Sequence, residues 1–156
     1  MPSIESLLLE SSSTLTAFLA AIEAERQCLN DSDSGALPDI TNRKAALAAQ
    51  LASIDTRRDT ALAAAGFSPG RAGIEAWLAS LPGASGKTFR ATWQSILELA
   101  ARAKSENEIN GNLIATRLQF NQQALGVLLG DTADSNTYGA DGQRSTKAGR
   151  RNLGSA

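Results

Sequence analysis

A long stretch without proline, residues 86–129, constrains the fold of this chain more than any other feature. Its apolar, small and polar residues recur at alternating spacings of four and three, which is the repeat of a helix that packs along one side. At about 1.5 Å of rise per residue, such a helix would be about 65 Å long, so we expect one end to extend beyond its neighbours. The stripe comprises Phe89, Trp93, Ile96, Ala100, Ala103, Asn107, Asn110, Ile114, Arg117, Asn121, Ala124 and Leu128.

Two earlier segments, residues 3–31 and 38–65, show the same helical repeat. Turn-forming residues at 30–35 separate them, and Pro38 suits the first turn of the second helix. We therefore expect the two helices to pair as a hairpin. The first stripe comprises Ile4, Leu8, Ser11, Leu15, Phe18, Ile22, Glu25 and Leu29, and the second comprises Ile40, Lys44, Leu47, Leu51, Ile54, Arg58 and Ala61.

A shorter apolar segment, residues 71–81, lies between two chain breaks. Gly66 and Pro69 end the preceding helix, and Pro82 with Gly83 ends the short one, which we expect to cover one end of the hairpin. The chain contains 28 alanines and 20 leucines but a single valine, so a β-sheet is hard to build from it. The predicted fold class is all-α: an elongated antiparallel helical hairpin or bundle of three long helices and one short helix, with coiled-coil-like packing.

The last part of the chain differs in composition from the rest. Residues 131–156 are rich in Gly, Ser, Asn, Asp and Arg, and Tyr138 and Leu153 are their only large apolar residues. Such a composition favours a mobile segment over a packed one. We therefore predict a helical domain over residues 1–130 and a flexible tail over residues 131–156.

Composition also argues against several function classes. The formal charge of −1 gives no electrostatic reason to bind nucleic acid, and the first residues lack the pattern of a signal peptide. The chain has no histidine and one cysteine, Cys28, which disfavours metal binding and catalysis.

The sequence 83–88 lacks the glycine spacing of a phosphate-binding loop, so we read Ser85 as a helix cap. We expect no enzyme activity, no cofactor, no metal, no nucleic acid and no membrane insertion.

The carboxyl-terminal half of the long third helix carries more apolar residues than one packing face needs. This surplus suggests that the helix binds an external partner. The apolar residues are Leu113, Ile114, Leu118, Phe120, Leu125, Val127, Leu128 and Leu129.

Three helix-weakening residues, Asn107, Asn110 and Gly111, lie in the middle of the same helix. A glycine there costs about 1 kcal/mol relative to alanine. In one interpretation the asparagines form hydrogen bonds that fix the register of the bundle, and the glycine allows close helix approach. In the other, the segment is a hinge between a rigid bundle and a mobile binding arm.

Three stretches of the sequence resemble the FlgN-type flagellar export chaperones. They are residues 37–51, with Leu37, Ile40, Thr41, Lys44, Leu47 and Leu51; residues 107–114, with Asn107, Asn110, Gly111, Leu113 and Ile114; and residues 137–142, Thr-Tyr-Gly-Ala-Asp-Gly. The alanine-rich second helix and residues 66–86 depart from the family pattern. With the helix order and the chain length, the resemblance covers nearly the whole sequence.

The resemblance implies a cytoplasmic, non-enzymatic chaperone that binds hook–filament junction proteins of the FlgK and FlgL type and delivers them to the flagellar type III export gate. It further implies that Tyr138 and Gly139 dock on the gate component FlhA, although these residues could equally form an ordinary turn. The alternative function is a structural coiled-coil protein that self-associates through its third helix, as a homodimer or a higher oligomer. In the chaperone interpretation the groove for the client comprises Ile114, Leu118, Leu125 and Leu128, flanked by Leu113 and Leu129.

Overall fold

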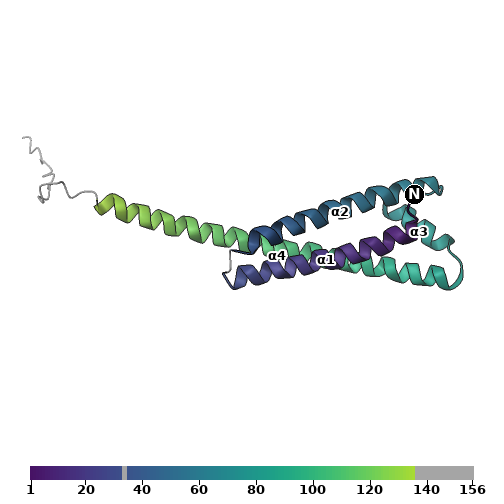
Figure 1. The fold of residues 1–156 in the computed structure, drawn as a ribbon, viewed down its shortest axis with the longest axis horizontal. Helices are drawn as coiled ribbons and strands as arrows, with labels where there is room; N and C mark the ends of the chain where they lie inside the picture. Colours follow the sequence, from purple (N-terminus) through teal and green to yellow (C-terminus); the bar gives the residue numbers. More distant parts are fainter. Residues whose placement is uncertain (33–34, 136–156) are drawn as a thin grey trace, which may run out of the picture. The chain divides into compact units, whose positions relative to one another are not determined.

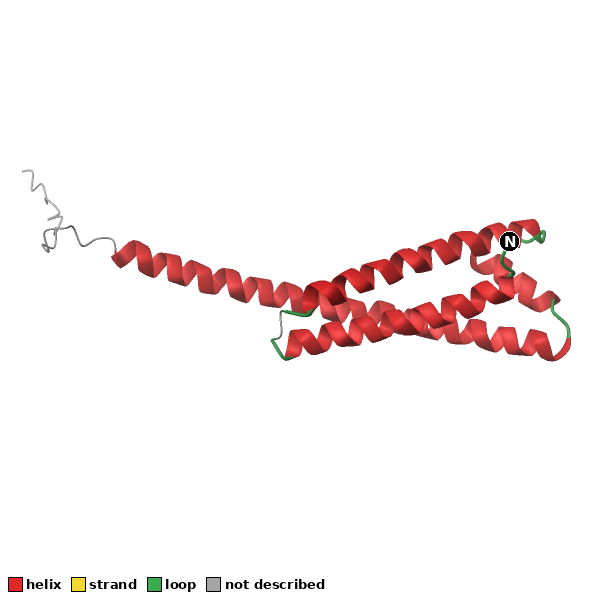
Figure 2. Cartoon of the chain, in the orientation of Figure 1, coloured by secondary structure: helices red, strands yellow, loops and turns green. Residues whose placement is uncertain are grey.

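The structure, a computed structural model, describes residues 1–32 and 35–135 and is helical throughout its regular elements (Figures 1 and 2). Its helices are α1 (Ile4–Asn30), α2 (Leu37–Ala64), α3 (Gly70–Ser80) and α4 (Gly83–Ser135). The described residues contain no strand, so the predicted all-α class with three long helices and one short helix is confirmed. The chain divides into two compact units, the first spanning Met1–Ile114 and the second beginning at Ala115.

Ion pairs in the first unit show how α1 and α2 are aligned. Arg57 of α2 pairs with Glu10 near the start of α1 at 2.7 Å, and Lys44 pairs with Glu25 near the end of α1 at 2.8 Å. The start of α1 therefore lies beside the later part of α2, and the end of α1 lies beside its early part. The two helices form an antiparallel hairpin (Figure 1).

The first part of α4 packs against this hairpin. The guanidinium of Arg58 lies 5.8 Å from the ring centroid of Trp93, and Lys44 Nζ donates to Asn107 Oδ1 at 2.9 Å. These two contacts show that α4 runs antiparallel to α2 and thus in the same direction as α1. Within Met1–Ile114 the result is a bundle of three long helices.

The predicted packing stripe of α1 matches its buried face closely. Seven of the eight predicted positions are buried, and Phe18 is half-buried. The fully buried large apolar side chains come from three helices, and all but Ile22 belong to one hydrophobic cluster at the α3 end of the bundle. They are Leu7, Leu8, Ile22, Ile54, Leu62 and Ile74.

Helix α3 covers this end of the core. Its first backbone N–H, at Gly70, donates to Asp59 Oδ1 of α2 at 2.9 Å, and the rings of Trp77 and Phe89 lie 6.2 Å apart. Gly73 faces the preceding turn so closely that an added Cβ would lie 1.6 Å from the carbonyl oxygen of Ser68. Glycine is therefore required at position 73 for α3 to begin where it does.

The bounds of α4 differ from the expected 86–129 at both ends. The helix begins at Gly83, so Ser85 lies inside its first turn and is not the helix cap that we expected. Gly86 is buried there, and an added Cβ would lie 2.4 Å from the carbonyl oxygen of Leu81. At the other end the helix includes residues 131–135, and the remainder of the predicted tail lies outside the described residues.

Among the described residues, α1 alone is long and apolar enough to cross a membrane by length and composition, with a mean hydropathy of 1.3 in its most apolar window. A core helix of a soluble bundle can have the same properties. In this structure α1 buries Ser11, Thr14 and Glu25 as well as apolar residues, and Glu25 is paired with a lysine of α2.

Candidate functional site

The residues predicted to bind a partner lie in the second half of α4. We call residues 112–130 the arm. Leu113 is half-buried, whereas the other predicted positions are exposed: Ile114 at 41%, Leu118 at 57%, Leu125 at 58%, Leu128 at 62% and Leu129 at 68%.

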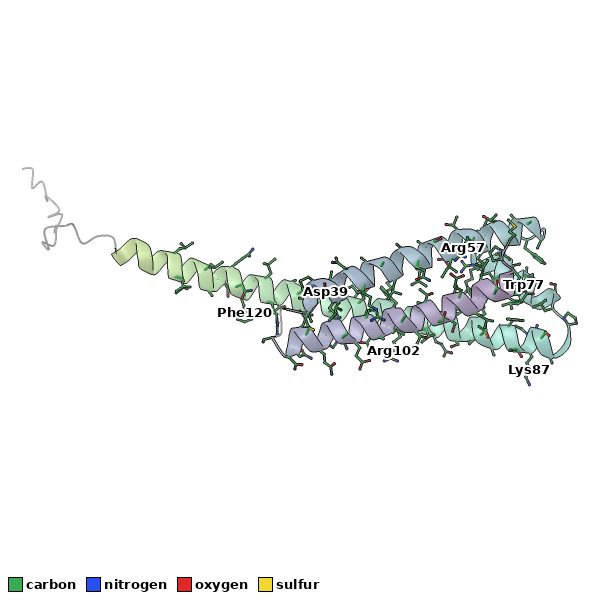
Figure 3. The ribbon with its side chains drawn as sticks, viewed as in Figure 1. Asp39, Arg57, Trp77, Lys87, Arg102 and Phe120 are labelled. Carbon is green, nitrogen blue, oxygen red and sulfur yellow. The ribbon has the colours of Figure 1, made fainter. Side chains whose placement is uncertain are left out.

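Two further large apolar side chains of the arm are exposed but were not assigned to the predicted groove. Phe120, labelled in Figure 3, is 67% exposed, and Val127 is 65% exposed. Soluble proteins rarely leave so many neighbouring apolar side chains in water unless the surface binds something. The arm is therefore the strongest candidate for an interaction site.

The helix-weakening asparagines lie just before the arm, in the first unit. Asn110 is fully buried, and its Nδ2 donates to the carbonyl oxygen of Ile22 and to Glu25 Oε2, both at 2.8 Å. Its Oδ1 accepts from Arg26 Nε at 3.0 Å. A side chain with this many matched partners joins α4 to α1 at one register.

The carboxylate of Glu25 is the centre of this polar network. Glu25 is 1% exposed, and both of its oxygens accept from Lys44 Nζ, at 2.9 and 2.8 Å. Lys44 also donates to Asn107, so α1, α2 and α4 meet at one ammonium group. A buried carboxylate is tolerated only when it is paired and hydrogen-bonded, as it is here.

Gly111 follows this network but does not contribute a close contact. An added Cβ there would meet no atom within 4 Å, so the close helix approach that we expected at Gly111 is absent. Asn107 and Asn110 form the hydrogen bonds that the register interpretation requires. The hinge interpretation of Asn107, Asn110 and Gly111 stays a prediction.

A groove between α1 and α4, of about 430 Å³, was not predicted from the sequence. It is lined by apolar residues, among them Leu19, Ile22 and Leu99, and by charged residues, among them Arg26 and Arg102. The periodicity of each helix indicates which side faces inward. It does not show where side chains leave a groove between two helices, so no sequence signal could have found it.

The described residues contain no group of three or more His, Cys, Asp or Glu side chains that could hold a metal ion. Cys28 is half-buried. The predicted docking residues Tyr138 and Gly139 lie outside the described residues.

Comparisons with known proteins agree with this description. The family model described as FlgN protein matches residues 1–146. The chain is also similar to the crystal structure of a flagella synthesis protein FlgN from Pseudomonas aeruginosa, with 26% identity and a TM-score of 0.63, over 83% of this chain and 98% of that one. No protein of curated function matches the sequence.

The family match spans nearly the whole chain, and the structural match covers almost the entire length of the Pseudomonas protein. Both agree with the resemblance seen in the sequence. The chain therefore belongs to the FlgN family, a flagellar family of chaperone type.

Proposed function

We propose that this chain is a cytoplasmic export chaperone for hook–filament junction proteins of the FlgK and FlgL type. In this proposal the arm binds the client, prevents its premature assembly and remains bound until the complex reaches the flagellar type III export gate. The observation that carries the proposal is the run of exposed apolar side chains along the arm of a FlgN-family protein.

The physical role of such an arm follows from the chemistry of its clients. Subunits that polymerise through terminal segments keep those segments unfolded until assembly, and their apolar residues would otherwise associate early. An apolar helix can bury the matching face of an amphipathic client helix and so keep it from other copies. Binding of this kind is stoichiometric and reversible, and the binding step itself requires no ATP.

Delivery to the gate is the second part of the proposal. By resemblance to the family, Tyr138 and Gly139 dock on FlhA. We expect Tyr138→Ala to weaken binding to the cytoplasmic part of FlhA while leaving client affinity unchanged, as measured by titration calorimetry with each partner. Equal FlhA affinity for the two chains would remove Tyr138 from the docking element.

The decisive experiment is calorimetric titration with the FlgK-type and FlgL-type proteins of the source genome. The intact chain should bind with a negative heat-capacity change, because apolar area is buried, and a variant ending at Asn112 should lose binding. The control is the thermal unfolding of the truncated chain, since the polar network at Glu25 and Asn110 is retained. Leu118→Asp or Leu125→Asp with unchanged client affinity would show that the groove is assigned incorrectly.

The alternative function, a self-associating coiled coil, predicts a different result. If other copies of the chain cover the apolar side chains of the arm, sedimentation equilibrium will show a tight oligomer. The variant that ends at Asn112 should then be a monomer. In that case the intact chain should not bind the junction proteins. A monomer that binds them supports the chaperone.

A further inference from the structure

The arm carries two rows of residues rather than one. The first row comprises Ile114, Leu118, Asn121, Leu125 and Leu128, and the second comprises Leu113, Arg117, Phe120, Ala124 and Val127. Each row has alternating spacings of four and three, the repeat of a helix that packs against one other helix. Because an α-helix turns about 100° per residue, the two rows lie about 100° apart around α4.

The exposed side chains belong to both rows. In the first row Leu118 and Leu125 are more than half exposed, and in the second row Phe120 and Val127 are exposed to a similar degree. The other residues of the arm are polar or small, with the exception of Leu129, which is 68% exposed and lies next to the first row. They are Asn112, Ala115, Thr116, Gln119, Gln122, Gln123, Gly126 and Gly130.

Both rows can be followed back along α4 into its first half, where some of their positions contact α1 or α2. Trp93 and Asn107 contact Arg58 and Lys44 of α2. Counting on in sevens from Asn107 along the helix leads to Ile114, Asn121 and Leu128 of the first row.

The row that faces α1 behaves likewise. Leu99 and Glu106 line the groove shared with α1, and Glu106 pairs with Arg26. Counting on in sevens from Glu106 leads to Leu113, Phe120 and Val127 of the second row. The two rows of the arm thus continue the helix positions at which Trp93 and Asn107 contact α2 and Glu106 contacts α1.

The occupant that fits two such rows is a pair of helices. A second copy of this chain that pairs its own arm by two-fold symmetry would cover one line along the helix and leave the other row in water. The two rows also differ in chemistry, since the first has four aliphatic residues and one Asn, whereas the second mixes Phe, Val, Leu, Ala and Arg. Arg117 is the only charged residue from 112 to 130, so the matching client stripes should be largely uncharged.

We propose that the arm binds its client as a helical hairpin, in which two adjacent amphipathic client helices pack on the two rows and complete a three-helix bundle. The client helices then take the places relative to the arm that α1 and α2 take relative to the first half of α4. This inference rests on the proposed chaperone function and adds the form in which the client is held.

The test uses the full-length chain and a full-length FlgK-type protein. Hydrogen exchange followed by mass spectrometry should show two client segments that become protected on binding. Leu118→Glu in the first row and Phe120→Glu in the second should each lower the affinity about tenfold or more, since each buries a charge at a helix contact. The matched control is Gln119→Glu, which adds the same charge to the polar side and should change the affinity less than about twofold.

The outcomes separate this inference from the function on which it rests. The hairpin would be overturned, and the chaperone function left intact, if only one client segment were protected. The same holds if only one of the two substitutions, Leu118→Glu or Phe120→Glu, lowered the affinity for the client. Failure of the unaltered chain to bind any junction protein would overturn both. Since all three substituted side chains are exposed in the free chain, circular dichroism should show unchanged folding.

Discussion

The two halves of α4 share one residue pattern but have different surroundings. In the first half Trp93, Ile96 and Ala103 are each less than one-tenth exposed, and Trp93 and Ile96 belong to the core cluster formed with residues of α1, α2 and α3. In the second half Leu118 and Leu125, which continue the same helical repeat of four and three, are more than half exposed. Helical periodicity therefore indicates that a face will bind a partner, and it does not reveal whether the same chain supplies that partner.

The polar network marks the end of the covered half. Glu25, Lys44, Asn107 and Asn110 lie together where α4 packs against α1 and α2 shortly before the arm. Apolar packing tolerates small shifts along a helix, whereas a buried carboxylate must meet its lysine at one register. The network can thus fix the register of α4 against α1 and α2.

The largest expected effect on stability comes from removing the cation of this network. Lys44→Ala leaves the buried carboxylate of Glu25 without its charged partner, and we expect a loss of about 3–5 kcal/mol in the free energy of unfolding. Urea denaturation of the full chain measures this loss. The exposed arm should be unaffected, so the change falls on the covered half alone.

The double variant Glu25→Gln/Lys44→Ala is the matched control for this prediction. It removes the buried charge, while the amide oxygen can still accept from Asn110, so the loss should be smaller than for Lys44→Ala alone. If the two variants were equally destabilised, the cost would lie in lost packing by the lysine side chain and not in an uncompensated charge.

A pair of alanine substitutions within α4 compares its two halves directly. Ile96→Ala removes a side chain that is 5% exposed, and we expect it to cost about 2–4 kcal/mol. Leu125→Ala removes a side chain that is 58% exposed and should change the stability by less than about 0.5 kcal/mol. Client binding should show the reverse order, with the larger loss of affinity for Leu125→Ala. A large loss of stability for Leu125→Ala in the monomer would mean that the free chain already covers the arm.

The sequence predicted the inward faces well because burial follows local periodicity. The stripe of α1, including the polar positions Ser11 and Glu25, agrees with the structure, and so do the buried positions Ile54 and Arg58 of α2. The pairing of Glu25 with Lys44 and Asn110 could not be predicted. It depends on how far one helix slides along another, and the repeat of four and three permits several registers.

Local signals misled the prediction where backbone contacts decide the outcome. Ser85 has the chemistry of a cap, but α4 begins earlier, at Gly83, because Gly86 has no Cβ and can lie against the carbonyl of Leu81. Gly111 suggested a close approach, yet the space around it is open. Both glycines break the helical pattern equally in the sequence, and only the three-dimensional structure separates their roles.

The smallest expected effect comes from Gly111, at the junction of the two halves. Gly111→Ala adds a Cβ that meets no atom within 4 Å, in the interior of a continuous helix, so we expect a stabilisation of about 0.5–1 kcal/mol, measured by urea denaturation. Gly73→Ala is the contrasting control and should destabilise strongly, since its Cβ would overlap the carbonyl oxygen of Ser68. Client affinity decides between the interpretations of this segment. An unchanged affinity with a stiffer helix would remove the hinge role from Gly111, whereas a weaker affinity would show that binding requires the helix to bend between its covered half and its arm.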